Sequence, residues 1–125
     1  MGDQFVKPVL KQFSGELTTT GDTYEVVPND VDSSEYWYVK GFANLTIHLT
    51  CSTKKLFYKI EAAPSTTGNI PGDWDDLGIV DEYIAADETV IEEISQPIDF
   101  LRVSIRPVVS GENGKINVVI RGSSV

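Results

Sequence analysis

Residues 44–51, NLTIHLTC, decide the fold class, because apolar and polar side chains alternate along the whole stretch. Leu45, Ile47, Leu49 and Cys51 share one phase, and the polar residues between them share the other. Successive side chains of a β-strand point to opposite faces of the sheet, so this period gives one apolar and one polar face. The stretch predicts a strand that packs against a core on one side only.

The same alternation recurs along the chain. Residues 100–106 and 115–121 repeat it, and runs rich in Gly, Pro, Asn and Asp separate the candidate strands. Short strands broken by such turns are typical of antiparallel all-β domains. We therefore expect an all-β fold: a single antiparallel β-sandwich, jelly-roll-like or immunoglobulin-like. The expected strands are Glu16–Thr20, Thr23–Val27, Glu35–Phe42, Leu45–Cys51, Lys55–Ala62, Leu77–Val80, Thr89–Ile94, Phe100–Val109 and Lys115–Arg121.

Two local patterns add detail. Asn113-Gly114 lies between the last two candidate strands, and because both residues tolerate positive φ we expect a tight hairpin there. Residues 81–94 are acidic and contain alanines, but their apolar residues do not form a stripe with a period of 3.6. We favour two short strands around a turn at Asp87-Glu88, with one helical turn as the alternative.

The chain has 125 residues, which is enough for one domain with one core. Pro8 interrupts any ladder near the start, so we assign residues 1–13 to an extended N-terminal arm and 14–125 to the sandwich. The arm is apolar, and we expect it to dock on its own sandwich or on a neighbour through Phe5, Val9, Leu10 and Phe13.

The net charge of −9 is distributed unevenly. No basic residue lies between Lys59 and Arg102, whereas 11 of the 19 acidic residues do. Nucleic-acid binding needs clustered Lys and Arg, so we expect no nucleic-acid partner. The acidic segment could instead face a basic partner or pack head-to-tail against another copy.

The cysteine content and the distribution of apolar residues also bear on the cellular location of the protein. Cys51 is the single cysteine, which excludes an intrachain disulfide. No apolar run approaches the roughly 20 residues of a membrane span. The first residues lack a basic region followed by an apolar block, so we expect no signal peptide, synthesis in the cytoplasm, and no membrane partner.

Catalytic chemistry finds little support. His48 is the single histidine and falls in the opposite strand phase from Cys51, so the two cannot form a nucleophile–base pair within that strand. No phosphate-binding loop, dinucleotide fingerprint or zinc spacing occurs, and we predict a non-enzymatic protein without cofactors.

A calcium site is the remaining metal hypothesis. Counted from Asp73 as the first position, the sequence matches an EF-hand loop at positions 1, 3 and 6 and fails at 5 and 12. Asp73, Asp75 and Asp76 are therefore weak candidates for a looser Ca²⁺ site, and a solvated acidic turn is favoured.

Aromatic residues supply the candidate binding sites. Trp74 lies in a polar turn, where it could be a platform for a sugar ring; we favour a ring that folds back over the end of the sandwich. In Tyr36-Trp37-Tyr38 the tryptophan must face away from both tyrosines. Phe57, Phe100, Arg102 and Arg106 occupy the polar phase of their strands, which predicts a protein–protein contact.

Residues 56–122 run from LFYKIEAAP through GNIPGDWDDLGIVDE and PIDFLRVSI to a final KINVVIRG. This cadence resembles small β-sandwich virion proteins of tailed bacteriophages, including head-decoration and tail accessory proteins. The resemblance implies a multi-copy structural protein of the virion, most simply a capsid decoration or cement protein that bridges shell subunits. Its partners would be capsid or other virion proteins or further copies of itself. A carbohydrate-binding or host-adhesion module built around Trp74 is the alternative.

Overall fold

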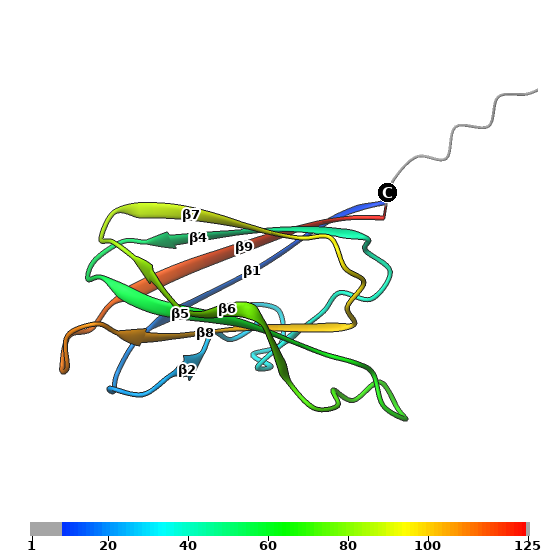
Figure 1. Ribbon diagram of the computed structural model, residues 1–125, viewed down its shortest axis with the longest axis horizontal. Coiled ribbons are helices and arrows are strands. Elements are labelled where there is room, and N and C mark those ends of the chain that lie inside the picture. Colours follow the sequence, from blue (N-terminus) through cyan, green and yellow to red (C-terminus); the bar gives the residue numbers. More distant parts are fainter. Residues whose placement is uncertain (1–8, 125) are drawn as a thin grey trace, which may run out of the picture.

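The computed structural model describes residues 9–124, and every regular element in that range is a β-strand (Figure 1). No helix in the described part of the chain is long and apolar enough to cross a membrane. The strands are β1 (Leu10–Thr18), β2 (Glu25–Val26), β3 (Trp37–Tyr38), β4 (Asn44–Cys51), β5 (Leu56–Ala63), β6 (Asp75–Ile84), β7 (Glu88–Ile94), β8 (Phe100–Pro107) and β9 (Lys115–Ser123).

The strands form two facing sheets, and each pairing is antiparallel. The first sheet has the order β1-β9-β4-β7, and the second has the order β2-β8-β5-β6, with β3 also paired to β8. The chain changes sheets between β1 and β2, β3 and β4, β4 and β5, β6 and β7, β7 and β8, and β8 and β9, so each layer is built from distant segments (Figure 1). The predicted single antiparallel β-sandwich is confirmed.

The core lies between the two sheets and follows the alternation of the sequence. In β4 the four odd-numbered residues of the NLTIHLTC stretch are buried, while Thr46, His48 and Thr50 lie on the outer face. Ile116, Val118 and Ile120 of β9 pack beside them. Trp37 and Tyr58 are the largest fully or nearly fully buried rings. Burial of this apolar surface is the main force that holds the sheets together.

The predicted hairpin at Asn113-Gly114 is wrong. β8 belongs to the second sheet and β9 to the first, so residues 108–114 cross between layers. Positive φ occurs at Gly111 and not at Asn113 or Gly114. A Cβ on Gly114 would lie 2.6 Å from Leu56 Cδ2, so this glycine allows a close approach to the core.

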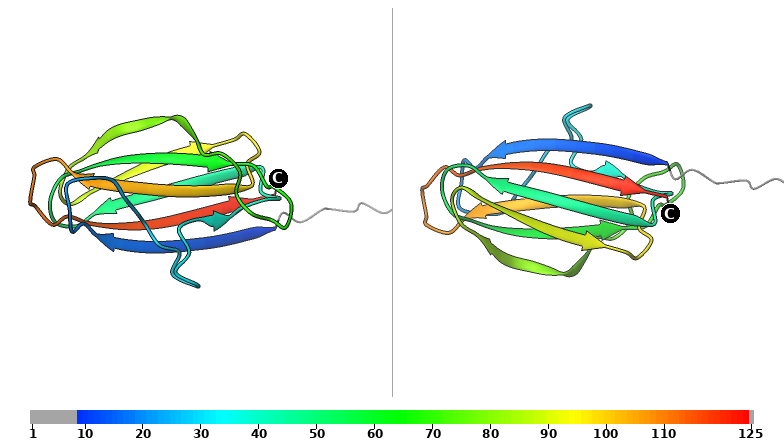
Figure 2. Two further views of the ribbon diagram at one scale, coloured as in Figure 1. Left: turned by 90° about the horizontal axis from the view of Figure 1, so that it is seen from below. Right: turned by 90° about the horizontal axis from the view of Figure 1, so that it is seen from above.

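Residues 81–94 form strands, as favoured, and contain no helical turn. β6 ends at Ile84, a turn follows with Asp87 at φ 63°, and β7 begins at Glu88. The two strands lie in different sheets and are edge strands of those sheets. The acidic segment therefore runs along one long side of the sandwich, and β1 lies on the opposite side (Figure 2).

The first strand begins earlier than Glu16. β1 starts at Leu10, inside the range assigned to the arm, and Leu10–Phe13 pair with Ile120–Ser123 of β9. The Phe13 ring meets Phe42 edge-on at 6.0 Å and packs against the core cluster. Phe5 lies outside the described residues. Leu10–Phe13 are therefore part of the first sheet, and Phe13 also packs against the core.

Candidate interaction surface

The outer face of the second sheet gathers most of the aromatic side chains. The chain has five Phe, five Tyr and two Trp residues, and seven of these aromatic residues lie there, together with three basic residues. We call this surface the aromatic–arginine face. It consists of Tyr24, Tyr36, Tyr38, Phe57, Trp74, Tyr83, Phe100, Lys59, Arg102 and Arg106.

Strand register brings this face together. Arg102 of β8 lies opposite Glu61 of β5, and Arg106 lies opposite Phe57, which in turn lies opposite Tyr83 of β6. Because Val103 and Ile105 of β8 point into the core, the alternating Arg102 and Arg106 point outward. The predicted interaction residues Phe57, Arg102 and Arg106 are thus neighbours on one surface.

Trp74 forms the first cluster with Arg102. The guanidinium carbon lies 4.3 Å from the indole centroid, a distance suited to a cation–π contact. Arg102 Nε also donates a hydrogen bond of 2.9 Å to Glu61 Oε1, and Lys59 Nζ is 3.8 Å from the same oxygen. These contacts fix the half-buried guanidinium and the ring above it.

Trp74 does not fold over the end of the sandwich as favoured from the sequence. It lies on the outer face of the second sheet, half-buried, with its ring centroid 6.3 Å from that of Tyr36. Trp74 therefore belongs to the aromatic–arginine face.

Arg106 organises the second cluster. Its guanidinium carbon is 4.4 Å from the Phe57 ring centroid and 5.4 Å from that of Tyr24. Asp81 Oδ1 accepts hydrogen bonds from the Tyr24 hydroxyl and from Arg106 Nη2, the latter at 3.4 Å. Burial, with the neighbouring Asp81, raises the pKa of Tyr24 to about 12, and the Tyr24 hydrogen bond lowers the pKa of Asp81.

Phe100 is not exposed, contrary to its strand phase. Its exposed fraction is 1%, because the rings of Tyr36 and Tyr38 cover it at centroid distances of 5.2 and 5.0 Å. The outermost rings are Tyr38, which is 43% exposed, and Tyr83, which is 51% exposed. Sequence reasoning missed Tyr24 and Tyr83 as members of this face; the odd–even phase of β6 was hidden by its bulges.

The other predicted residues lie apart from this face. Val9 and Leu10, at the start of β1, are 60% and 74% exposed. Asp73, Asp75 and Asp76 are exposed, and Asp76 accepts a hydrogen bond from the Gly78 N–H. Within residues 9–124, no cluster of three or more His, Cys, Asp or Glu side chains is arranged to hold a metal ion.

His48 and Cys51 lie on opposite faces of β4. The Cys51 thiol is buried and donates to the Lys54 carbonyl at 2.8 Å. Burial raises the pKa of that thiol, which disfavours the reactive thiolate. The geometry matches the expectation that these two residues do not act as a pair.

Comparison with known proteins places the fold. No protein-family model and no curated protein matches the chain. A chain in the structure of the infectious bursal disease virus Gx strain is 11% identical with a TM-score of 0.53, covering 98% of this chain and 33% of that one. A chain of the infectious bursal disease virus VP2 subviral particle is 10% identical with a TM-score of 0.52, covering 94% and 32% respectively.

The likeness to these two structures concerns the fold. This chain spans about a third of the length of each of the two matched chains. A chain of the cyanophage Pam1 capsid asymmetric unit is also similar, at 8% identity and a TM-score of 0.47, over 98% of this chain and 90% of that one.

Proposed function

We propose that this chain is a non-enzymatic structural protein of a bacteriophage virion, and specifically a capsid decoration or cement protein that bridges shell subunits. The aromatic–arginine face is the attachment surface, and the exposed Val9 and Leu10 at the start of β1 contribute a second contact. The acidic strands β6 and β7 remain toward solvent or a basic neighbour. The protein is present in many copies on each particle.

The composition of the aromatic–arginine face carries this proposal. Tyr, Trp, Phe and Arg are enriched in protein interfaces, where they supply most of the binding free energy. On this face Arg102 contacts the ring of Trp74 and Arg106 contacts the ring of Phe57, so both rings are already positioned in the unbound protein. A preorganised surface loses less conformational entropy on binding. Surface side chains with only a solvation role would not need such fixed geometry.

The fold likeness supports the same assignment. Two structures of infectious bursal disease virus, one of them a subviral particle, contain a similar sandwich. A sandwich of two short sheets offers broad, rigid outer faces, which suits a protein that packs among shell subunits.

The attachment surface can be tested by adding purified protein to shells of the encoding phage that lack it. In the variant Trp74→Ala/Tyr83→Ser, two rings of the face are removed. Loss of a hot-spot ring weakens binding by about 2 kcal/mol or more, so attachment should be roughly 30-fold weaker or worse. The bound amount is measured by gradient centrifugation followed by gel densitometry.

Ile91→Ser is the matched control. Ile91 is 54% exposed, close to the 51% of Tyr83, but lies on the outer face of β7 in the first sheet. We expect the control variant to attach as the parent does. Parent-like attachment of the Trp74/Tyr83 variant would contradict the proposal.

Glycan binding is the second candidate, favoured by one observation. Trp74 is half-exposed beside Tyr36 on an outer face, an arrangement on which a sugar ring can stack. Arg102 already contacts the indole, which leaves less of the ring free. A glycan array with the parent and Trp74→Ala separates the candidates: binding that is lost in the variant would favour host adhesion.

A further inference from the structure

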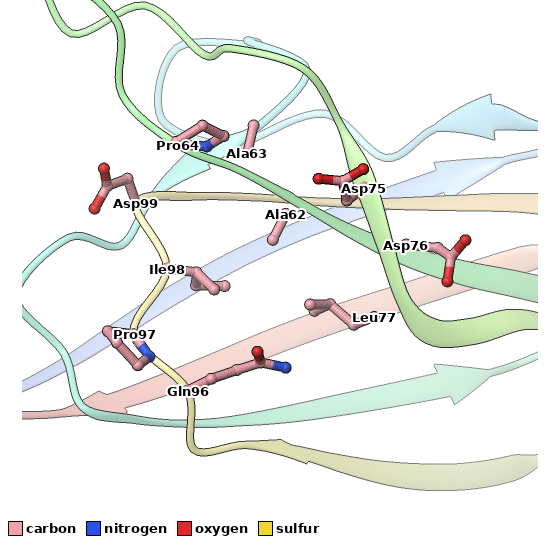
Figure 3. Close-up of a pocket in the computed structure, with 10 residues that line it drawn as sticks. All are labelled: Ala62, Ala63, Pro64, Asp75, Asp76, Leu77, Gln96, Pro97, Ile98 and Asp99. Atoms are coloured by element: carbon pink, nitrogen blue, oxygen red, sulfur yellow. The ribbon is translucent and has the colours of Figure 1, made fainter.

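A hollow of about 470 Å³ lies at the end of the sandwich where residues 96–99 pass the end of β5 and the start of β6 (Figure 3). Asp75 and Asp76 are consecutive in β6, so their side chains point to opposite faces of the second sheet. The carboxylates of Asp76 and Asp99 point away from the apolar side chains of the hollow (Figure 3). Its polar groups therefore do not converge on a common ligand.

The opposite end of the sandwich holds the crossing between β8 and β9, where Asn113 precedes Gly114 (Figure 1). The sequence has five asparagines, and this one alone is followed by glycine. Such a pair is prone to deamidation, because glycine has no Cβ to hinder the approach of its backbone nitrogen to the asparagine side chain. The crossing therefore contains the most reactive asparagine of the chain.

Deamidation proceeds through a ring that the two residues form by themselves. The Gly114 amide gives up its proton to the solvent, and its nitrogen bonds to Asn113 Cγ. The bond between Cγ and the side-chain nitrogen breaks, and ammonia leaves after gaining a proton from the solvent. Water then opens the succinimide to aspartate, or to isoaspartate, in which the main chain runs through Cβ and Cγ. The net change replaces ammonia by water.

The structure holds the attacking nitrogen in a hydrogen bond. The Gly114 N–H donates to Thr19 Oγ1 at 2.9 Å, and Gly114 O accepts from the Thr19 N–H at 2.8 Å. Thr19 is 0% exposed and Gly114 is buried. Removing the proton from this nitrogen would place a charge away from water, which is costly. The reciprocal contact with Thr19 therefore opposes the first step of the reaction.

Packing also fixes the position of Gly114. A Cβ on this residue would lie 2.6 Å from Leu56 Cδ2 and 3.1 Å from Lys54 O, so its backbone has little space to turn toward the Asn113 side chain. Asn113 itself is exposed. Water therefore reaches the side chain, while the nitrogen that must attack it is held in place.

We propose that Asn113-Gly114 is a site of spontaneous deamidation that Thr19 keeps closed in the folded protein. The site reacts only when the end of β1, which Thr19 directly follows, separates from the crossing between β8 and β9. Isoaspartate adds a carbon to the main chain beside Gly114, where Leu56 leaves no space, so this product cannot restore the contact with Thr19. Deamidation thus marks irreversibly the molecules whose crossing has opened. This property belongs to the single folded chain and is independent of shell attachment.

The rate of deamidation tests this. The parent and a capped peptide of residues 110–116 are incubated in the same buffer, and the products at position 113 are quantified by mass spectrometry of proteolytic fragments. The folded chain should react at least about a hundredfold more slowly than the peptide, since local opening limits its rate. In Thr19→Val, which lacks the hydroxyl acceptor, the rate should rise roughly tenfold, because a buried N–H loses its partner.

Thr53→Val is the matched control. Thr53 Oγ1 accepts a 2.9 Å hydrogen bond from the N–H of Lys115, the next amide along the chain. This variant should react at the rate of the parent, and so should Thr19→Ser, which keeps the hydroxyl. A parent-like rate in Thr19→Val, equal acceleration in Thr53→Val, or deamidation of the parent at the rate of the peptide would each overturn the proposal.

Hydrogen exchange of the Gly114 N–H in the parent keeps the proposal testable if Thr19→Val does not fold. The same hydrogen bond that blocks deamidation should slow this exchange by at least about a hundredfold relative to the peptide. Exchange at the rate of the peptide would show that the contact with Thr19 does not hold the amide.

Discussion

At the scale of single residues, Gly15 shows how closely the two layers approach. It lies in β1 and faces inward, toward the indole of Trp37. A Cβ at this position would lie 2.2 Å from the Pro28 carbonyl oxygen and 2.9 Å from Trp37 Cζ2. The carbonyl oxygen of the neighbouring Ser14 accepts a 3.2 Å hydrogen bond from Trp37 Nε1–H. Glycine therefore lets the largest core side chain be both packed and hydrogen-bonded.

Gly15→Ala should lower the free energy of unfolding by about 2–3 kcal/mol, because backbone atoms must move to admit the methyl group. Urea denaturation followed by tryptophan fluorescence measures this change. Gly21→Ala is the control: no atom lies within 4 Å of its Cβ position, so a change within about 0.5 kcal/mol is expected. Equal stability of both variants would show that β1 can shift away from Trp37 at little cost.

The alternation of residues predicted the face of the sheet to which each side chain points. It was a poorer guide to which of those side chains are exposed to solvent. Strand phase placed Phe57, Arg102 and Arg106 on an outer face, and the structure has them there. Phase could not reveal that Phe100 is covered, because the covering rings of Tyr36 and Tyr38 come from a segment far away in sequence. Contacts between distant segments depend on sheet order, which periodicity within one strand does not encode.

At the scale of elements, the connection between β8 and β9 explains the main topological error. A turn sequence between two alternating strands fits a hairpin and a crossover between sheets equally well. β8 pairs with β5, β2 and β3, and β9 pairs with β1 and β4, so both strands have partners on each side without pairing to one another. The local alternation of residues predicts where strands occur. The order of the strands in each sheet depends on how the whole core packs, which local alternation does not predict.

β1 is the element whose role differs most from its expected one, and truncation tests this. The free energy of unfolding of a chain that begins at Ser14 should be about 2–3 kcal/mol lower than that of a chain that begins at Val9. It loses the pairing of Leu10–Phe13 with β9 and the partly buried Phe13 ring. Urea denaturation of the two truncated chains measures the difference.

A single substitution separates the strand's packing from its exposed residues. Leu10→Ser should change the free energy of unfolding by less than about 0.5 kcal/mol, because Leu10 is 74% exposed. If the chain that begins at Ser14 were as stable as the one that begins at Val9, residues 9–13 would behave as an arm and not as part of the sheet.

At the scale of the whole molecule, the acidic segment coincides with the two sheet edges on one side of the sandwich. β7 is an edge of the first sheet and β6 an edge of the second, and both lie on the same side (Figure 2). Exposed edge strands can pair with those of other molecules, and charged side chains on them oppose this. Glu82 of β6 and Glu88 and Glu93 of β7 are exposed along these edges. The acidic segment thus limits uncontrolled edge-to-edge association in a protein proposed to act in many copies.

Neutralising those edge carboxylates should promote self-association. For Glu82→Gln/Glu88→Gln/Glu93→Gln we expect an association constant roughly tenfold above that of the parent, since each like-charge contact across paired strands costs some tenths of a kcal/mol. Light scattering over a concentration series measures it. The control Glu35→Gln/Asp73→Asn/Glu112→Gln removes the same formal charge from positions outside all the strands. Equal association of the two triple variants would mean that net charge, and not the protection of these two edges, keeps the molecules apart.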